Sequence, residues 1–151
     1  MLRSAVPDDL PALIEMGRAM HAESPNFSRY AFSADVLKRS LLAFMASADG
    51  FVVVYEREGD PVGVVVAMCA RQWFSEELMA CDLAVFVKPG HRGGMAAARL
   101  IGAYHLWAVK KGVRFPSLGI STGVHEEATA RLYQGLGFSK QRSTTFEASD
   151  V

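Results

Sequence analysis

The chain has 151 residues, of which 50% are hydrophobic and 21% are charged, a composition that suits one folded domain and argues against a disordered chain. Sixteen basic and sixteen acidic side chains give a formal net charge of zero, so nucleic-acid binding through the net field is not expected. No apolar run approaches the roughly 20 residues that cross a bilayer, and the N-terminus lacks the apolar segment of a signal peptide. Two cysteines, Cys69 and Cys81, are too few for a disulfide scaffold or a cysteine-only zinc site. We therefore expect a cytoplasmic protein with reduced thiols and no metal.

The N-terminal third predicts one short strand and two helices. Residues Leu2–Val6 are a strand candidate, and Pro7–Pro11 indicates a helix start because aspartate and proline are favoured in a first turn. Apolar residues then recur at helical spacing, namely Leu10, Leu13, Ile14, Gly17 and Met20. Pro25 breaks this pattern, and Ser33 is expected to cap a second helix with a buried stripe of Leu37, Leu41, Phe44, Met45 and Ala48.

The middle of the chain changes to a strand pattern. β-Branched runs at Phe51–Tyr55 and Val62–Met68 flank the turn-like segment Arg57–Pro61, which predicts an antiparallel hairpin. A third strand is predicted at Ala80–Val87, and it ends before a proline that removes a backbone donor.

The remaining chain alternates helices with short strands. The predicted elements are a long helix at Gly93–Lys111, a strand at Phe115–Ile120, a helix near Glu126–Leu136, a last strand at Thr144–Phe146 and a further candidate strand at Phe138. Strands joined across a helix run parallel, whereas hairpin strands are antiparallel. The sequence therefore predicts an α/β fold with a mixed, mostly antiparallel central sheet and helices on both faces, in the order β-α-α-β-β-β-α-β-α-β.

A glycine-rich turn joins the strand Ala80–Val87 to the long helix. Arg92, Gly93 and Gly94 stand at the helix start, where unpaired N–H groups and the positive end of the helix dipole attract phosphate. The glycines remove side chains where a diphosphate approaches the backbone, and the arginine adds a cation. The turn therefore predicts an anion site; the alternative is a plain glycine turn with a solvated arginine.

Tyr133 is the second candidate functional residue. On the predicted helix it flanks a stripe formed by Ala128, Leu132 and Leu136, so its ring can pack while its hydroxyl reaches a cleft. The alternative is a tyrosine at the edge of the core with its hydroxyl satisfied by the protein.

Together the two segments resemble the GNAT superfamily of acyl-CoA-dependent N-acyltransferases, in particular its small bacterial and phage-borne branch. That family has Val-x-Pro, then Arg/Gln-x-x-Gly-x-Gly/Ala at the start of the central helix, and later Tyr-x-x-x-Gly-Phe. The matches here are Val87–Pro89, Arg92–Ala97 and Tyr133–Phe138. The resemblance implies a GNAT-like fold and a single acyltransferase domain over residues 1–151.

The chain departs from the family pattern at several places. Glu126 and Thr129 stand where the family often has an asparagine and an alanine before the tyrosine. Met95 stands where the family has a glycine, so Gly93 and Gly94 must shape the turn. The strand positions that carry a general base in some members are Cys81 and Leu83. Strict alternation places Asp82 on the opposite face of the sheet. The base is therefore not identified, and the candidates are ordered water, His21, Glu76, Glu77 and Asp82.

The resemblance also implies a mechanism and a set of site residues. The amine of an acceptor attacks the thioester of bound acetyl-CoA, the co-substrate, without an acyl-enzyme. The pantetheine arm lies along the main chain of Val85, Phe86 and Val87, and one of these N–H groups polarises the thioester oxygen. The pyrophosphate is bound by Arg92, Gly93, Gly94, Met95, Ala96 and Ala97. Tyr133 protonates the departing thiolate, and the segment His21–Phe32 is expected to contact the acceptor.

The acceptor itself is not fixed by the sequence. We expect a small-molecule or peptide amine, no membrane, no nucleic acid, and a homodimer, since family members are often dimers. One alternative is a non-catalytic acyl-CoA-binding or interaction module on the same fold. Another is an acyltransferase that acts on a macromolecule, such as a protein N-terminus, a lysine or a nucleic-acid base.

Overall fold

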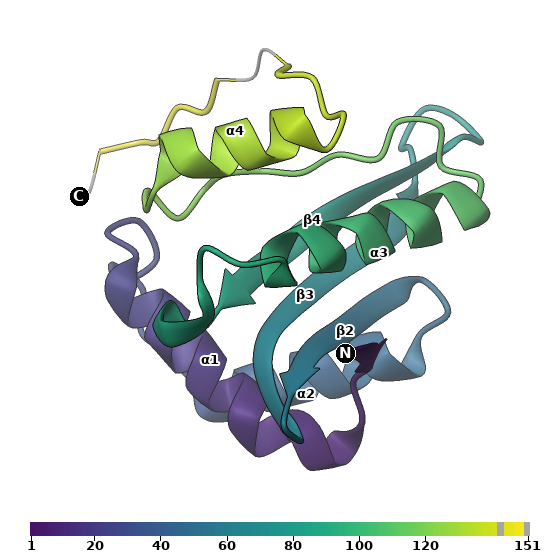
Figure 1. Ribbon diagram of the computed structural model, residues 1–151. Helices are drawn as coiled ribbons and strands as arrows, with labels where there is room; N and C mark the ends of the chain where they lie inside the picture. The colour runs from purple at the N-terminus through teal and green to yellow at the C-terminus, as the bar shows by residue number, and fades with distance from the viewer. Residues whose placement is uncertain (142–143, 150–151) are drawn as a thin grey trace.

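A computed structural model describes residues 1–141 and 144–149 of the protein. Its centre is an antiparallel sheet of four strands in the order β1-β2-β3-β4 (Figure 1). The strands are β1 (Leu2–Ser4), β2 (Gly50–Arg57), β3 (Asp60–Arg71) and β4 (Leu78–Val87). Their valine-rich sequences favour the pleated backbone, and valines on both faces are buried. The predicted hairpin is therefore confirmed as β2 and β3.

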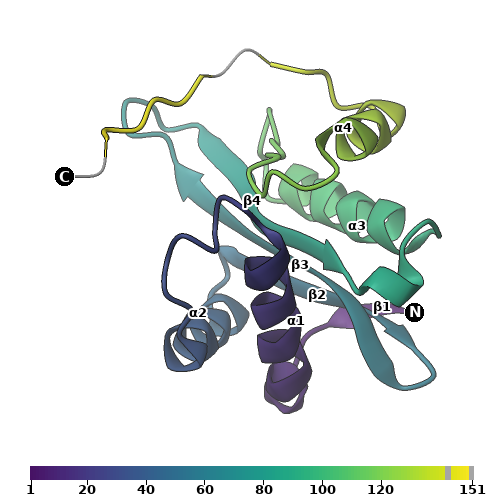
Figure 2. The same ribbon diagram turned by 90° about the vertical axis from the view of Figure 1, so that its left-hand side faces the viewer.

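Helices cover both faces of the sheet (Figure 2). On one face lie α1 (Leu10–Glu23), which follows the short turn η1 (Pro7–Asp9), and α2 (Ala34–Ala46). On the other lie α3 (Ala96–Lys110), which follows the turn η2 (Pro89–His91), and α4 (Glu126–Gly135). One core cluster fills the space between the sheet and α1 and α2, and the other the space between the sheet and α3. In the described part of the chain, no helix is long and apolar enough to cross a membrane.

The predicted fold class is confirmed, and the helices lie close to their predicted bounds. Ser33 caps α2 as expected, because its hydroxyl accepts the Val36 N–H at 3.3 Å. The long helix begins at Ala96 rather than at Gly93, because Gly93 has φ of +81°, which lies outside the helical region. Gly112 ends the same helix, as predicted.

The three predicted strands after α3 are wrong. Phe115–Ile120 makes a single parallel bridge, from Ser117 to Cys81, and then leaves the edge of β4. Pro116 within this segment has no N–H to donate to a ladder. Phe138 and Thr144–Phe146 also lie outside any strand, because without a strand at 115–120 they have no sheet edge beside them. The parallel pairing that would make the sheet mixed is therefore reduced to one bridge.

The two thiols do not meet. Cys69 stands opposite Ala80, and Cys81 stands opposite Met68, so the cysteines occupy adjacent registers of the β3–β4 pair. Successive side chains of a strand point to opposite faces. Cys69 and Cys81 therefore lie on different sides of the sheet, and both are free.

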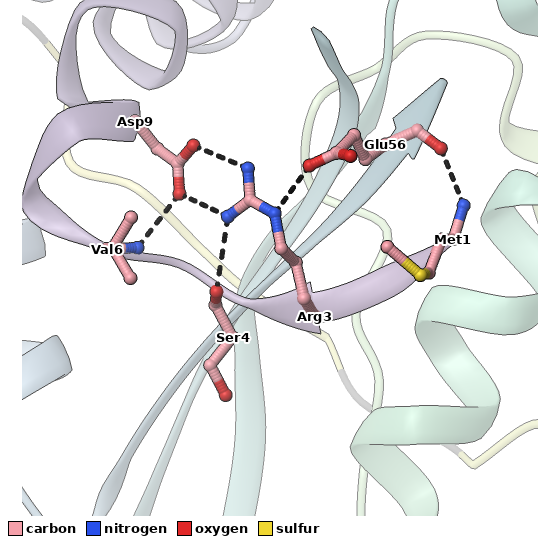
Figure 3. Close-up of polar contacts among 6 residues, drawn as sticks. All are labelled: Met1, Arg3, Ser4, Val6, Asp9 and Glu56. Carbon is pink, nitrogen blue, oxygen red and sulfur yellow. Dashed lines mark hydrogen bonds and ion pairs between the residues drawn. The ribbon is translucent and has the colours of Figure 1, made fainter. Parts of the chain in front are cut away.

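Arg3 ties the start of α1 to the sheet (Figure 3). Its guanidinium donates to both carboxylate oxygens of Asp9, at 2.7 and 2.8 Å, and to Glu56 of β2 at 2.5 Å. Asp9 is buried and also accepts the Val6 N–H at 2.8 Å. The hydrogen bonds from Arg3 hold the pKa of Asp9 below its ordinary value of 3.8. Asp9 thus pairs with Arg3 instead of capping the helix.

Replacing Arg3 tests this pairing. Arg3→Met leaves a buried carboxylate without its partner and should lower the free energy of unfolding by about 3 kcal/mol at neutral pH. The lowered pKa of Asp9 stabilises the wild type above pH 3.8, and this contribution is lost as the pH falls through the lowered value. The difference in the free energy of unfolding between the wild type and Arg3→Met, measured by urea unfolding, should therefore decrease in acid. Arg131→Met is the control. It removes an ion pair between two exposed side chains, Arg131 and Glu127, and should change the free energy of unfolding by less than about 0.5 kcal/mol. An equal effect of both substitutions contradicts the account.

Candidate active site

A β-bulge in β4 sets the direction of Asp82. Opposite the consecutive residues Val66 and Ala67 stand Ala84 and Asp82, so Leu83 is the extra residue of the bulge. Ala67 belongs to the core between the sheet and α3, and Asp82 as its partner therefore faces the α3 side. The expectation that Asp82 points to the other face is wrong, because strict alternation does not allow for an extra residue.

A cleft lies beside β4, between this strand and the segment that follows α3. Ser117 is fixed to the sheet, since its N–H donates to Ala80 at 3.0 Å and its carbonyl accepts the buried Tyr104 hydroxyl at 2.7 Å. Gly119 N–H donates to Asp82 Oδ1 at 2.8 Å, and past this point no backbone hydrogen bond between the described residues joins the segment to β4. The cleft has a volume of about 550 Å³. It is lined by eight of the predicted site residues: Val85, Phe86, Val87, Arg92, Gly93, Gly94, Ala97 and Tyr133.

Two predicted site residues turn their side chains elsewhere. Met95 is 62% exposed, and Ala96 is buried in the core between α3 and the sheet. Neither residue lines the cleft. Each can therefore contribute to a ligand there only through its backbone N–H.

The start of α3 offers a row of unpaired N–H groups. The first hydrogen bond of the helix runs from Arg99 N to Met95 O at 2.9 Å. None of the amides from Gly93 to Ala98 donates to an acceptor within residues 1–141 and 144–149. A Cβ at Gly93 or Gly94 would meet nothing within 4 Å, so the approach to these amides is open. Unpaired amides at the positive end of a helix dipole form an anion site.

Arg92 is fixed beside this row and is not a solvated side chain. Its Nε donates to the carbonyl of Val87 at 2.8 Å, and its Nη2 donates to Glu23 at the end of α1, also at 2.8 Å. The guanidinium lies 5.2 Å from the centre of the Phe86 ring. Glu23 is a site residue that sequence reasoning missed, because it lies 69 positions from Arg92 and no local pattern links them.

The outer edge of β4 presents main-chain groups to the cleft. Lys88 N–H donates to Val62 and so points toward β3. Along a strand the main-chain groups alternate in direction. The N–H groups of Val85 and Val87 therefore point away from β3, toward the cleft, whereas that of Phe86 faces β3.

Tyr133 and Asp82 share the inner wall of the cleft. The Tyr133 hydroxyl donates to Gly119 O at 3.3 Å, and the residue is 8% exposed. Burial raises the pKa of Tyr133 above its ordinary value of 10.0, and the charge of Asp82 raises it further. Burial also raises the pKa of Asp82, although the Gly119 N–H opposes this shift. Tyr133 therefore keeps its proton at neutral pH.

The remaining candidate bases lie outside the cleft. His21 Nε2 is 2.6 Å from the carbonyl of Tyr30, and Glu76 and Glu77 are exposed near the β3–β4 turn. Of the four protein candidates for the base, Asp82 is the one that lines the cleft.

The family profile described as "Acetyltransferase (GNAT) domain" matches residues 48–140, more than half of the chain. The fold is thus that of an acetyltransferase domain. The chain belongs to the GNAT acetyltransferase family, as the motifs at Arg92 and Tyr133 predicted. The predictions of an acyl-CoA-dependent N-acyltransferase, with acetyl-CoA as co-substrate, are confirmed at the level of this family.

Solved structures share the fold at low sequence identity. A putative acetyltransferase from Agrobacterium tumefaciens has a TM-score of 0.78 at 20% identity, with 99% of each chain covered. The aminoglycoside acetyltransferase AAC(6')-Iy, in complex with a CoA-based bisubstrate analogue, has a TM-score of 0.80 at 16% identity, covering 100% of this chain and 98% of that one. An aminoglycoside acetyltransferase from an uncultured soil metagenomic sample, in complex with sisomicin, has a TM-score of 0.75 at 17% identity, covering 100% and 96%. No curated protein matches the sequence.

The state of Tyr133 can be measured by an alkaline titration. The chain has four tyrosines, and Tyr133→Phe removes one whose pKa is raised above 10.0. The difference in tyrosinate absorbance between wild type and variant should therefore develop above pH 10.0. A difference that develops at lower pH would show that the Tyr133 hydroxyl is not buried in the cleft wall.

Proposed function

We propose that the protein transfers an acetyl group from acetyl-CoA directly to the amine of a small-molecule acceptor. The observation that carries this proposal is the open start of α3, where the unpaired amides of residues 93–98 can receive the pyrophosphate of CoA. Gly93, Gly94 and Ala97 line the cleft, with Arg92 beside them. The edge N–H groups of Val85 and Val87 can pair with the pantetheine arm. The CoA-based analogue bound to AAC(6')-Iy on the same fold supports this assignment.

The chemistry moves protons at two atoms, the acceptor nitrogen and the departing sulfur. The acceptor nitrogen forms a bond to the thioester carbonyl carbon, and the bond from that carbon to sulfur breaks. An edge N–H of β4 polarises the carbonyl oxygen as negative charge develops there. Asp82, whose pKa burial raises, takes the proton that the ammonium group must lose before attack. Tyr133 gives its proton to the thiolate as the carbon–sulfur bond breaks. The acceptor nitrogen loses a second proton as the amide forms, and this proton restores the Tyr133 hydroxyl through solvent.

The direct test is a titration of the purified protein with acetyl-CoA, followed by an assay of CoA release with a panel of small amines. Binding and amine-dependent release are expected. Absence of binding at millimolar acetyl-CoA contradicts the proposal. Binding without release across the panel would instead favour the non-catalytic module.

Gly93→Ala should weaken acetyl-CoA binding. A side chain at φ of +81° is strained, by about 1–2 kcal/mol, so the turn must shift and the dissociation constant should rise about tenfold. Gly90→Ala is the matched control, because Gly90 lies in the same turn, has no positive φ and would also place its Cβ in open space. Calorimetry of both variants measures the difference, and equal affinities would remove the turn from the CoA site.

Tyr133→Phe should lower kcat by about 100-fold or more, because it removes a general acid. The affinity for acetyl-CoA should change little, since the hydroxyl donates to Gly119 and not to the start of α3. Tyr55→Phe, on β2 and outside the residues that line the cleft, should leave kcat unchanged. An unchanged kcat of Tyr133→Phe, with acetyl transfer shown to be rate-limiting, would exclude Tyr133 as the acid.

A further inference from the structure

We infer that the acceptor is a small amine with one positive charge and an apolar body, and not a polycation such as an aminoglycoside. This substrate class rests on the proposed acetyl transfer and specifies which amine the cleft accepts. Three properties of the cleft point to it: its charge, its free hydrogen-bonding groups and its size.

The cleft offers one carboxylate to a cation. Among the described residues that line it, the carboxylates are Glu23 and Asp82. Glu23 is neutralised by Arg92 at 2.8 Å. Asp82 remains, with Oδ1 already accepting the Gly119 N–H. One ammonium group can pair with the other oxygen of Asp82, whereas further ammonium groups on the same molecule would be desolvated without a partner.

Three carbonyl oxygens of the segment 119–122 already accept protein donors. Gly119 O accepts the Tyr133 hydroxyl at 3.3 Å. Thr122 O accepts the hydroxyl of Ser24, a fully buried residue, at 2.6 Å, and Ser121 O accepts the Asn26 amide at 2.8 Å. A ligand rich in hydroxyl and amino groups would therefore find these three carbonyl oxygens already occupied, and donors buried against them would stay unpaired.

The hydrogen bonds from Ser24 and Asn26 also hold the loop after α1 against residues 121–123. Gly123 has φ of +74°, and a Cβ there would lie 3.1 Å from both Pro25 and Asn26. A glycine is therefore needed for the two loops to come so close. This junction holds Ser121 and Thr122, which line the cleft, beside the loop after α1.

Apolar side chains also line this part of the cleft, next to the polar side chains of Ser121, Thr122, His125 and Thr129, and the space is small. The apolar side chains include Met20, Phe27, Leu83, Ile120 and Val124. The cleft volume of about 550 Å³ falls within the ~300–1,000 Å³ typical of a site for one drug-sized ligand. Here the thioester arm must share it with the acceptor. A compact apolar amine fits what remains.

Three amines test this substrate class on the full-length protein at saturating acetyl-CoA. The first is 2-phenylethylamine, which has one amine on an apolar body. The second is spermidine, which has several amines on an apolar chain, and the third is sisomicin. We expect kcat/KM for 2-phenylethylamine to exceed the other two values by about tenfold or more. A kcat/KM for spermidine or sisomicin equal to or above that of 2-phenylethylamine overturns the substrate class but leaves the proposed acetyl transfer standing. Absence of CoA release with every amine overturns both.

A gain of negative charge gives a second, independent readout. Leu83 is the bulge residue, lines the cleft and is 45% exposed, so a polar side chain there should be tolerated. Leu83→Glu should raise the ratio of kcat/KM for spermidine to that for 2-phenylethylamine by about fivefold or more. Leu83→Gln, of the same size but uncharged, should leave the ratio within about twofold. Equal ratios for the two variants would show that negative charge in the cleft does not determine which acceptor is used. Thermal melting of both variants confirms that the comparison is made between folded proteins.

Discussion

Backbone amides without partners at the start of α3, beside an unpaired edge of β4, are the feature on which the rest of the site depends. The amides are free because the first N–H groups of a helix have no acceptor within the helix. The edge is open because the segment after α3 touches the sheet at Ser117 and then departs at Gly119. A full strand in its place would satisfy the edge and fill the cleft. The buried cores on both faces hold β4 and α3 rigidly enough to keep these polar groups open to a ligand.

Side chains of different chemistry line different parts of the cleft. The unpaired amides at the positive end of the α3 dipole, with the Arg92–Glu23 pair beside them, suit a diphosphate, and Asp82 with Tyr133 forms a wall suited to moving protons. Glu23 binds Arg92 across the cleft and so joins α1 to the phosphate turn. The solved structures with aminoglycosides share the fold at under 20% identity, which leaves the lining free to differ. In this chain the pairing of Glu23 leaves Asp82 as the carboxylate available to an amine within the described lining.

Local patterns predicted the parts of the fold and site that local sequence determines. Valine runs gave the hairpin, Ser33 gave the start of α2, and the glycines at 93 and 94 marked the turn before α3. The bulge at Leu83 was not predicted, because it depends on how β4 pairs with β3. The Glu23–Arg92 pair and the loss of the strand at 115–120 likewise follow from distant partners. These non-local contacts decide which other residues line the cleft, so the sequence located the glycine turn before α3 better than the rest of the lining.

The most direct measurement of the central claim is an amide NMR titration of the isotope-labelled protein with CoA. The account predicts that the largest shifts fall on the amides of residues 93–98 and on Val85 and Val87, since these N–H groups have no acceptor in the described part of the chain and gain one from the ligand. Absence of shifts at millimolar CoA, or shifts confined to other amides, would contradict the account.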